Sequence, residues 1–307
     1  MISSIFERTN PINFIILCVF ISLFLIGGFF LYLEVPFTLE VLIKLFQSLI
    51  IIITSLFLID FINRKNFLTK SNSFTLFFFV LIFCLFPKIF NQTNLLISNV
   101  FILMSFRRLV SIRSNRDIEI KIFDASLWVF VATFFYSWSL LFILLVFAGI
   151  FLYKKNDYRN LLIPFVALSV VLVLAFTFYY LTNHLEKFYS LVYFAPEFTI
   201  EKYEDIRYII PLLFICVMGI WSTIAFFLRK QSKSFVTRVP GILIFLMLIL
   251  AILVAIISES ANTSEVIFSI FPLSIIIAKN VENIKKLWIK EIFLWSFIIL
   301  PFIILFL

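Results

Sequence analysis

The sequence predicts an all-α fold, a polytopic transmembrane helical bundle of ten or eleven spans with its N-terminus in the cytoplasm. Two observations predict it. Hydrophobic residues make up 63% of the 307 residues and charged residues only 14%, too few to cover a surface that faces water. The apolar residues also form long runs separated by short charged breaks, as expected when lipid is the solvent.

Apolar runs follow one another along the whole chain. A helix needs roughly 20 residues to cross the hydrocarbon layer. The first run is long enough to span, and no small-residue cleavage site follows it, so we interpret it as a retained helix rather than a signal peptide. The candidate spans are residues 12–33, 41–62, 73–90, 92–106, 122–136, 138–153, 160–182, 206–228, 238–257, 264–280 and 287–307.

The charges between these segments alternate in sign. The positive-inside rule places the basic loops in the cytoplasm, and eleven crossings then put all of them on one side and the C-terminus outside. The net charge of +8 therefore reflects membrane topology and not nucleic-acid binding. The basic residues of these loops are Arg64, Lys65, Lys70, Arg107, Arg108, Arg113, Arg116, Lys121, Lys154, Lys155, Arg159, Arg229, Lys230, Lys233, Arg238, Lys279, Lys285, Lys286 and Lys290.

Residues 92–106 and 122–136 are the shortest segments. As helices they would be roughly 22 Å long, less than the hydrocarbon layer of roughly 30 Å. Two interpretations remain open for them. They span with local thinning of the bilayer, anchored at the interface by Trp128, Tyr136 and Trp138, or they are re-entrant helices that other helices shield from lipid. The same two interpretations are open for residues 138–153, which follow at this turn.

The remaining stretches are too short to bury a core of their own, so residues 1–307 are expected to form one integral membrane domain. No span has an acid or a histidine at its centre, which argues against a proton pump or an ion-coupled transporter. The chain has five glycines and no phosphate-binding loop, three cysteines without paired spacing, and a single histidine, His184. We therefore expect no cofactor and no metal site.

Two acids lie near the cytoplasmic ends of helices. Asp60 precedes Arg64 by four residues, so the two can pair along one helix face. Asp124 opens a helix, and Arg107 and Arg108 end the preceding one. Guanidinium groups match both carboxylates and phosphates, so we expect one arginine to pair with Asp124 and the other to bind a lipid phosphate or an acid of a partner.

The first external loop, LEVPFTLE, contains Glu34 and Glu40. A carboxylate at the membrane surface can act as a general base toward a hydroxyl group, or hold a divalent metal near a phosphate. The alternative is that acids gather outside only because basic residues are excluded there.

Two resemblances extend this interpretation. The stretches FERTNPINFIIL, LFPKIFNQTNLLISNVFILMSFRRLVSI and KIFDASLWVFVATFFYSWSLLFILLVF resemble an uncharacterised family of inner-membrane proteins from flavobacteria and other Bacteroidota. The order of an acidic first loop, a helix, a basic turn, LFP and paired short helices is more faintly similar to the start of GT-C membrane glycosyltransferases. That family uses polyprenyl-phosphate sugars and places an acidic catalytic residue in the first external loop.

The second resemblance implies specific roles. Glu34 or Glu40 would be the catalytic base or a ligand for a divalent metal, with Lys202 or Arg207 near the lipid phosphate. The sequence lacks the usual adjacent acidic pair and a C-terminal soluble domain. The expected function is cell-envelope biogenesis in the bacterial inner membrane, with membrane lipids and a polyprenyl-phosphate lipid as ligands. The alternative is a non-enzymatic subunit of an envelope machine for secretion, gliding or lipoprotein handling, bound to other membrane subunits.

Overall fold

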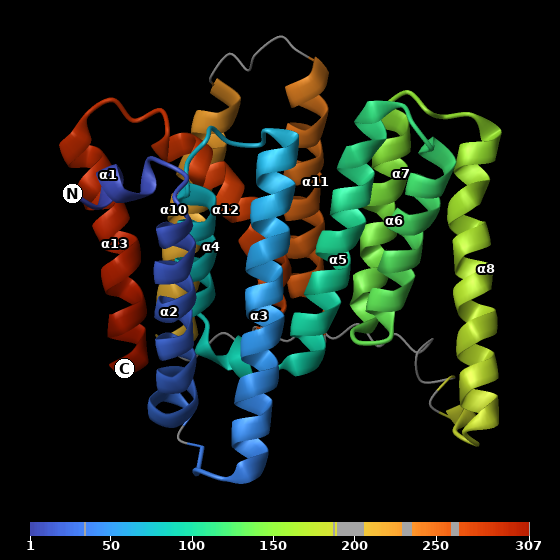
Figure 1. Ribbon diagram of the computed structural model, residues 1–307, viewed down its shortest axis with the longest axis horizontal. Helices are drawn as coiled ribbons and strands as arrows, with labels where there is room; N and C mark the ends of the chain where they lie inside the picture. The colour runs from blue at the N-terminus through green and yellow to red at the C-terminus, as the bar shows by residue number, and fades with distance from the viewer. Residues whose placement is uncertain (34, 187, 189–205, 229–234, 259–263, 307) are drawn as a thin grey trace.

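The computed structural model is a bundle of helices that run side by side between two faces (Figure 1). It describes residues 1–33, 35–186, 188, 206–228, 235–258 and 264–306. Eight helices within these residues are long and apolar enough to cross a membrane, and two shorter apolar helices, Phe74–Cys84 and Ser137–Leu152, accompany them. The chain is thus an all-α, multi-pass membrane protein, as the sequence predicts.

The elements of the described residues follow in this order: α1 (Ile2–Phe6), α2 (Pro11–Gly27), the π-helix η1 (Gly28–Tyr32), α3 (Leu39–Asn66), α4 (Phe74–Cys84), η2 (Pro87–Asn91), α5 (Thr93–Ser111), η3 (Ile112–Ser114), α6 (Ile118–Thr133), η4 (Ser137–Phe142), α7 (Ile143–Leu152), α8 (Tyr158–Leu181), α10 (Ile206–Leu228), α11 (Phe235–Ile257), η6 (Ser264–Val266), α12 (Ile267–Val281) and α13 (Leu287–Phe306).

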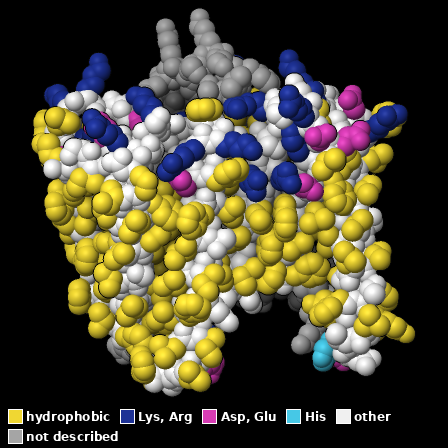
Figure 2. Space-filling view, viewed as in Figure 1, with side chains coloured by type: hydrophobic (Ala, Val, Ile, Leu, Met, Phe, Trp, Pro, Cys, Tyr) yellow, Lys and Arg dark blue, Asp and Glu magenta, His cyan; other side chains and the backbone are white. Residues whose placement is uncertain are grey.

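The two ends of the bundle differ in charge. The N-terminus lies at one end and the C-terminus at the other (Figure 1). Lysine and arginine side chains gather at the end that holds the N-terminus, above a broad apolar belt (Figure 2). We call this end, which carries Lys65, Arg107, Arg113 and Lys121, the basic face, and the other end the opposite face. This arrangement is the one expected of a bundle that crosses a bilayer.

The core forms around α12. Nearly all of its side chains are buried, and α4, α10 and α11 pack around it. All residues of α4 are buried as well. Because α4 has 11 residues, it is only roughly 16 Å long. A helix this short is tolerated at membrane depth because its neighbours shield its ends from lipid.

Several predicted segments have different boundaries in the structure. The segment 122–136 is α6, which begins at Ile118, so Asp124 lies within this helix and does not open it. The prediction that residues 92–106 form a short helix is wrong at the C-terminal end, because α5 continues to Ser111. Arg107 and Arg108 extend the helix, since arginine is a good helix former whose long side chain carries its charge out to water. Within residues 73–90, the helix ends at Cys84 because Pro87 disfavours helix in the residue before it.

The hairpin after α5 follows the predicted order. Helix α6 ends at Thr133, Tyr136 is extended, and the chain returns through η4 and α7. Helix α8 then lies at the edge of the bundle (Figure 1). It packs mainly on α6, where Phe130, Ala167 and Val171 form a small cluster separate from the main core. Helices α5 and α6 pack closely along their length, and this packing brings the end of α5 and the start of α6 together at the basic face.

Candidate functional site

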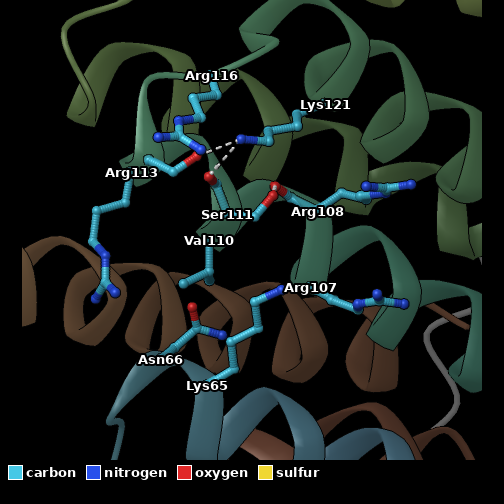
Figure 3. Close-up of a pocket in the computed structure, with 10 residues that line it drawn as sticks. Lys65, Asn66, Arg107, Arg108, Val110, Ser111, Arg113, Arg116 and Lys121 are labelled. Atoms are coloured by element: carbon cyan, nitrogen blue, oxygen red, sulfur yellow. Dashed lines mark hydrogen bonds between the residues drawn. The ribbon is translucent and has the colours of Figure 1, made fainter.

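A pocket of about 340 Å³ opens at the basic face, where α3 and α5 end and α6 begins (Figure 3). Pockets that bind small molecules start at about this size. No carboxylate lines it. Its ten lining residues, which we call the basic pocket, are Lys65, Asn66, Arg107, Arg108, Val110, Ser111, Arg113, Ser114, Arg116 and Lys121.

The turn after α5 explains why so many cations meet here. The chain reverses through two left-handed residues, Asn115 and Asp117, so that α6 returns beside α5. Lys121, in the first turn of α6, then reaches back to the end of α5. Its Nζ donates to the carbonyl oxygen of Ser111 at 3.1 Å and to Oγ of Ser114 at 2.6 Å (Figure 3). A cation at a helix C-terminus is favoured by the helix dipole.

Arg108 pairs with an acid that lies outside the lining. Its Nη2 is 3.0 Å from Oδ2 of Asp124 on α6. Both side chains are partly exposed, 42% for Arg108 and 25% for Asp124. Asp124 thus neutralises one arginine and links α5 to α6.

Arg107 and Lys65 rest on an aromatic ring instead of an acid. The guanidinium of Arg107 is 4.6 Å from the centroid of the Phe61 ring, and Nζ of Lys65 is 5.1 Å from it. Phe61 is itself 40% exposed. A cation–π contact at an exposed site contributes only about 0.5–1 kcal/mol and does not neutralise the charge.

Arg113 provides the sharpest observation in the pocket. Its Nη1 is buried, and within the described residues it has no hydrogen-bond partner. Buried polar atoms of native proteins are almost always hydrogen-bonded to protein or to water, so this donor is open to an acceptor that enters the pocket. An oxygen atom of an anion in the pocket would supply that acceptor.

Three acids elsewhere on this face have partners in the fold. Asp60 accepts from Nε of Arg64 at 2.8 Å. Glu7 is 3.1 Å from Nζ of Lys290, a lysine only 4% exposed. Glu291 accepts from the backbone N–H of Ser3 at 2.9 Å and so holds α1 against α13.

Glu282, the residue after α12, also serves the fold. It accepts from the backbone N–H of Lys70 at 3.0 Å and from Nδ2 of Asn72 at 2.6 Å. Of the cations that line the pocket, Lys65, Arg107, Arg113, Arg116 and Lys121 have no carboxylate partner in the described part of the chain.

Of the four site residues predicted at the outer surface, the structure describes Glu40 and Arg207. Glu34 and Lys202 lie outside the described residues. Glu40 is highly exposed at the start of α3, where Nζ of Lys44 lies 3.3 Å away. Arg207 sits at the start of α10, and its guanidinium is 5.6 Å from the centroid of the Tyr32 ring.

The structure adds residues at the opposite face that sequence reasoning missed. Nζ of Lys88, on η2, is 4.1 Å from the centroid of the Tyr208 ring on α10. Glu265, at the outer end of the predicted segment 264–280, lies on η6 just before α12 and is only 1% exposed. No group of three or more His, Cys, Asp or Glu side chains that would suit a metal ion occurs among the described residues.

Comparison with known families identifies the family of this chain. The model of a family of unknown function, DUF6427, matches residues 7–307. The chain belongs to the DUF6427 family. The match covers nearly the whole chain, so the entire bundle, including the basic pocket, is part of the DUF6427 unit. No curated protein and no solved structure matches the chain.

Proposed function

We propose that this membrane protein binds a phosphate-bearing anionic ligand in the basic pocket. The observation that carries the proposal is the set of six lysines and arginines around a pocket with no acidic lining. Arginine forms bidentate, charge-assisted hydrogen bonds to phosphate, and each such bond is worth about 1.5–3 kcal/mol. The buried Nη1 of Arg113 adds a donor that has no acceptor among the described residues.

The positive-inside rule assigns the basic face to the cytoplasm. In a bacterial inner membrane, the ligand would then be a headgroup of the cytoplasmic leaflet or a soluble phosphate compound. Basic pockets between transmembrane helices on the cytoplasmic side commonly bind phospholipid headgroups. Either source fits a role in cell-envelope biogenesis, whether the protein acts alone or as a subunit of a larger machine.

The test is binding by the purified full-length protein in an uncharged detergent at low salt. Inorganic pyrophosphate and phosphatidylglycerol micelles are added separately, and the thermal midpoint is followed by tryptophan fluorescence. We expect at least one of them to raise the midpoint, and the double variant Arg107→Gln/Arg113→Gln to lose the rise. The control variant Lys154→Gln/Lys155→Gln removes two cations of the same face outside the pocket. If neither ligand acts through the pocket, the proposal fails.

A second candidate function acts at the opposite face, on a polyprenyl-linked sugar, with the GT-C-like organisation described above. The observation that favours it is a pair of cations from separate elements. Arg207 lies over Tyr32 and Lys88 lies over Tyr208. Two cations on the ends of η2 and α10 suit a lipid phosphate at that surface.

Substitution of the loop acids tests this second candidate. The double variant Glu34→Gln/Glu40→Gln, expressed at the normal level, should abolish an envelope glycan if either carboxylate is the base or a metal ligand. Unchanged glycan in that variant would remove the candidate. The Arg107→Gln/Arg113→Gln variant serves as the comparison, because it changes the other face only.

A further inference from the structure

We infer that the ligand of the basic pocket is a membrane lipid whose headgroup carries two phosphate groups. This inference rests on the proposed function and narrows it in two ways: to a lipid rather than a soluble anion, and to a headgroup with two phosphates rather than one. Each step has its own structural basis.

The mouth of the pocket meets the surface that faces lipid. Phe61 is 40% exposed and Phe57, one helical turn deeper on α3, is 60% exposed. Arg107 and Lys65 lie on the Phe61 ring at the rim. Figure 2 shows lysine and arginine side chains directly above the apolar belt. A phosphate bound by Arg107 would therefore sit where a lipid holds its headgroup, with its chains along α3.

The unneutralised cations of the pocket also lie in two groups on different elements. Figure 3 shows Arg107 and Arg113 directed to opposite sides of the pocket, with Lys65 near Arg107 and Arg116 above. Arg108 is neutralised by Asp124. Two sets of unneutralised cations remain, one at the rim on α3 and α5 and one beside η3. A lipid with two phosphates joined by a short linker places one phosphate on each set.

The size of the pocket agrees with this division. About 340 Å³ is near the lower limit for pockets that hold a small molecule. Such a volume takes a headgroup but not acyl chains, which remain on the apolar surface outside. The exposed rings of Phe57 and Phe61 provide that surface.

The experiment compares four additives on the full-length protein in uncharged detergent. These are cardiolipin, with two phosphates per lipid, phosphatidylglycerol, with one, phosphatidylcholine as a zwitterionic lipid, and inorganic pyrophosphate as a soluble diphosphate. Affinity is measured by native mass spectrometry or by thermal shift. We expect cardiolipin to bind at least about tenfold more tightly than phosphatidylglycerol, since a second phosphate adds at least one charge-assisted hydrogen bond.

Three variants locate the effect. Arg107→Gln and Arg113→Gln, made separately, should each remove the preference for cardiolipin, while binding of phosphatidylglycerol falls less. Phe57→Ala should weaken cardiolipin but leave pyrophosphate unchanged, because Phe57 belongs to the apolar rim and carries none of the pocket cations. Lys154→Gln/Lys155→Gln is the control and should change neither.

The outcomes separate the two proposals. Equal affinity for cardiolipin and phosphatidylglycerol, both lost in the Arg107→Gln/Arg113→Gln variant, would overturn the two-phosphate inference and leave the proposed function standing. Pyrophosphate binding as tight as cardiolipin binding, with no effect of Phe57→Ala, would overturn the lipid assignment. Binding of every anion that is unaffected by the pocket variants would end both proposals.

Discussion

Arg108 and Arg113 line the same pocket, but their surroundings differ. Arg108 is 3.0 Å from Asp124, whereas Nη1 of Arg113 is buried without an acceptor among the described residues. Removing Arg108 leaves a carboxylate at the edge of the membrane without its partner. Removing Arg113 deletes an unneutralised positive charge from a group of like charges.

We therefore predict that Arg108→Ala lowers the free energy of unfolding by about 1 kcal/mol, a value discounted for the partial exposure of the pair. Arg113→Ala should leave the ligand-free protein unchanged or raise its stability, because it relieves repulsion. Thermal unfolding of both variants in lipid-free detergent measures the difference.

The partner substitution provides the control. Asp124→Asn combined with Arg108→Ala should recover part of the loss, since the unpaired carboxylate is then gone. Equal midpoints for the Arg108 and Arg113 single variants would mean that these charges serve only to orient the chain in the membrane.

At this scale, the sequence indicates which residue types meet but not their surroundings. The four-residue spacing of Asp60 and Arg64 and the position of Asp124 after two arginines both indicate contacts that occur in the structure. The unsatisfied donor of Arg113 depends on the left-handed turn after α5, whose geometry the pattern of apolar residues does not contain. The burial of Glu265 likewise depends on which helices surround α12.

Close packing between elements gives a prediction at Gly28, in the π-helix that ends α2. A Cβ atom at Gly28 would lie 2.7 Å from Cδ2 of Phe90, a ring on η2 that is fully buried. At the neighbouring Gly27, the nearest atom is 3.1 Å away and belongs to the flexible end of Leu305. The absence of a side chain at Gly28 is thus what lets η1 approach η2.

We predict that Gly28→Ala destabilises the protein by about 1–3 kcal/mol, the usual cost of overpacking a core. Gly27→Ala is the matched control, with the same change one residue earlier, and should have the smaller effect because Leu305 can move. Thermal unfolding of both variants tests this. A Gly28 variant as stable as the Gly27 variant would show that η2 shifts freely and does not fix the end of α2.

Hydropathy predicts the order of the elements better than their ends. The runs of apolar residues locate the long helices because lipid imposes a fixed length on them. The apolar pattern places the end of α5 too early, because it stops at the first charge, although Arg107 and Arg108 reach water from within the helix. The short length of α4 follows from burial by its neighbours, which a single segment of sequence does not reveal.

The whole molecule separates its charges by face. Acids near the basic face mostly hold the fold together, as Glu291 holds α1 and Glu282 holds the turn after α3. The cations of the basic pocket can instead bind a ligand or fix the orientation of the bundle in the membrane. Both uses require the basic face to lie on one defined side of the membrane, so the orientation of the bundle is the most general prediction.

Helix α8 offers the cleanest place to test it, because it lies at the edge of the bundle and packs mainly on α6. Its N-terminus follows Lys154 and Lys155, and its C-terminus precedes His184 and Glu186. Reporter fusions after Lys155 and after His184 should therefore report opposite sides, with Lys155 in the cytoplasm. If both fusions report the same side, α8 does not cross the membrane. If the two sides are reversed, the basic pocket faces away from the cytoplasm, and its ligand must come from the other leaflet.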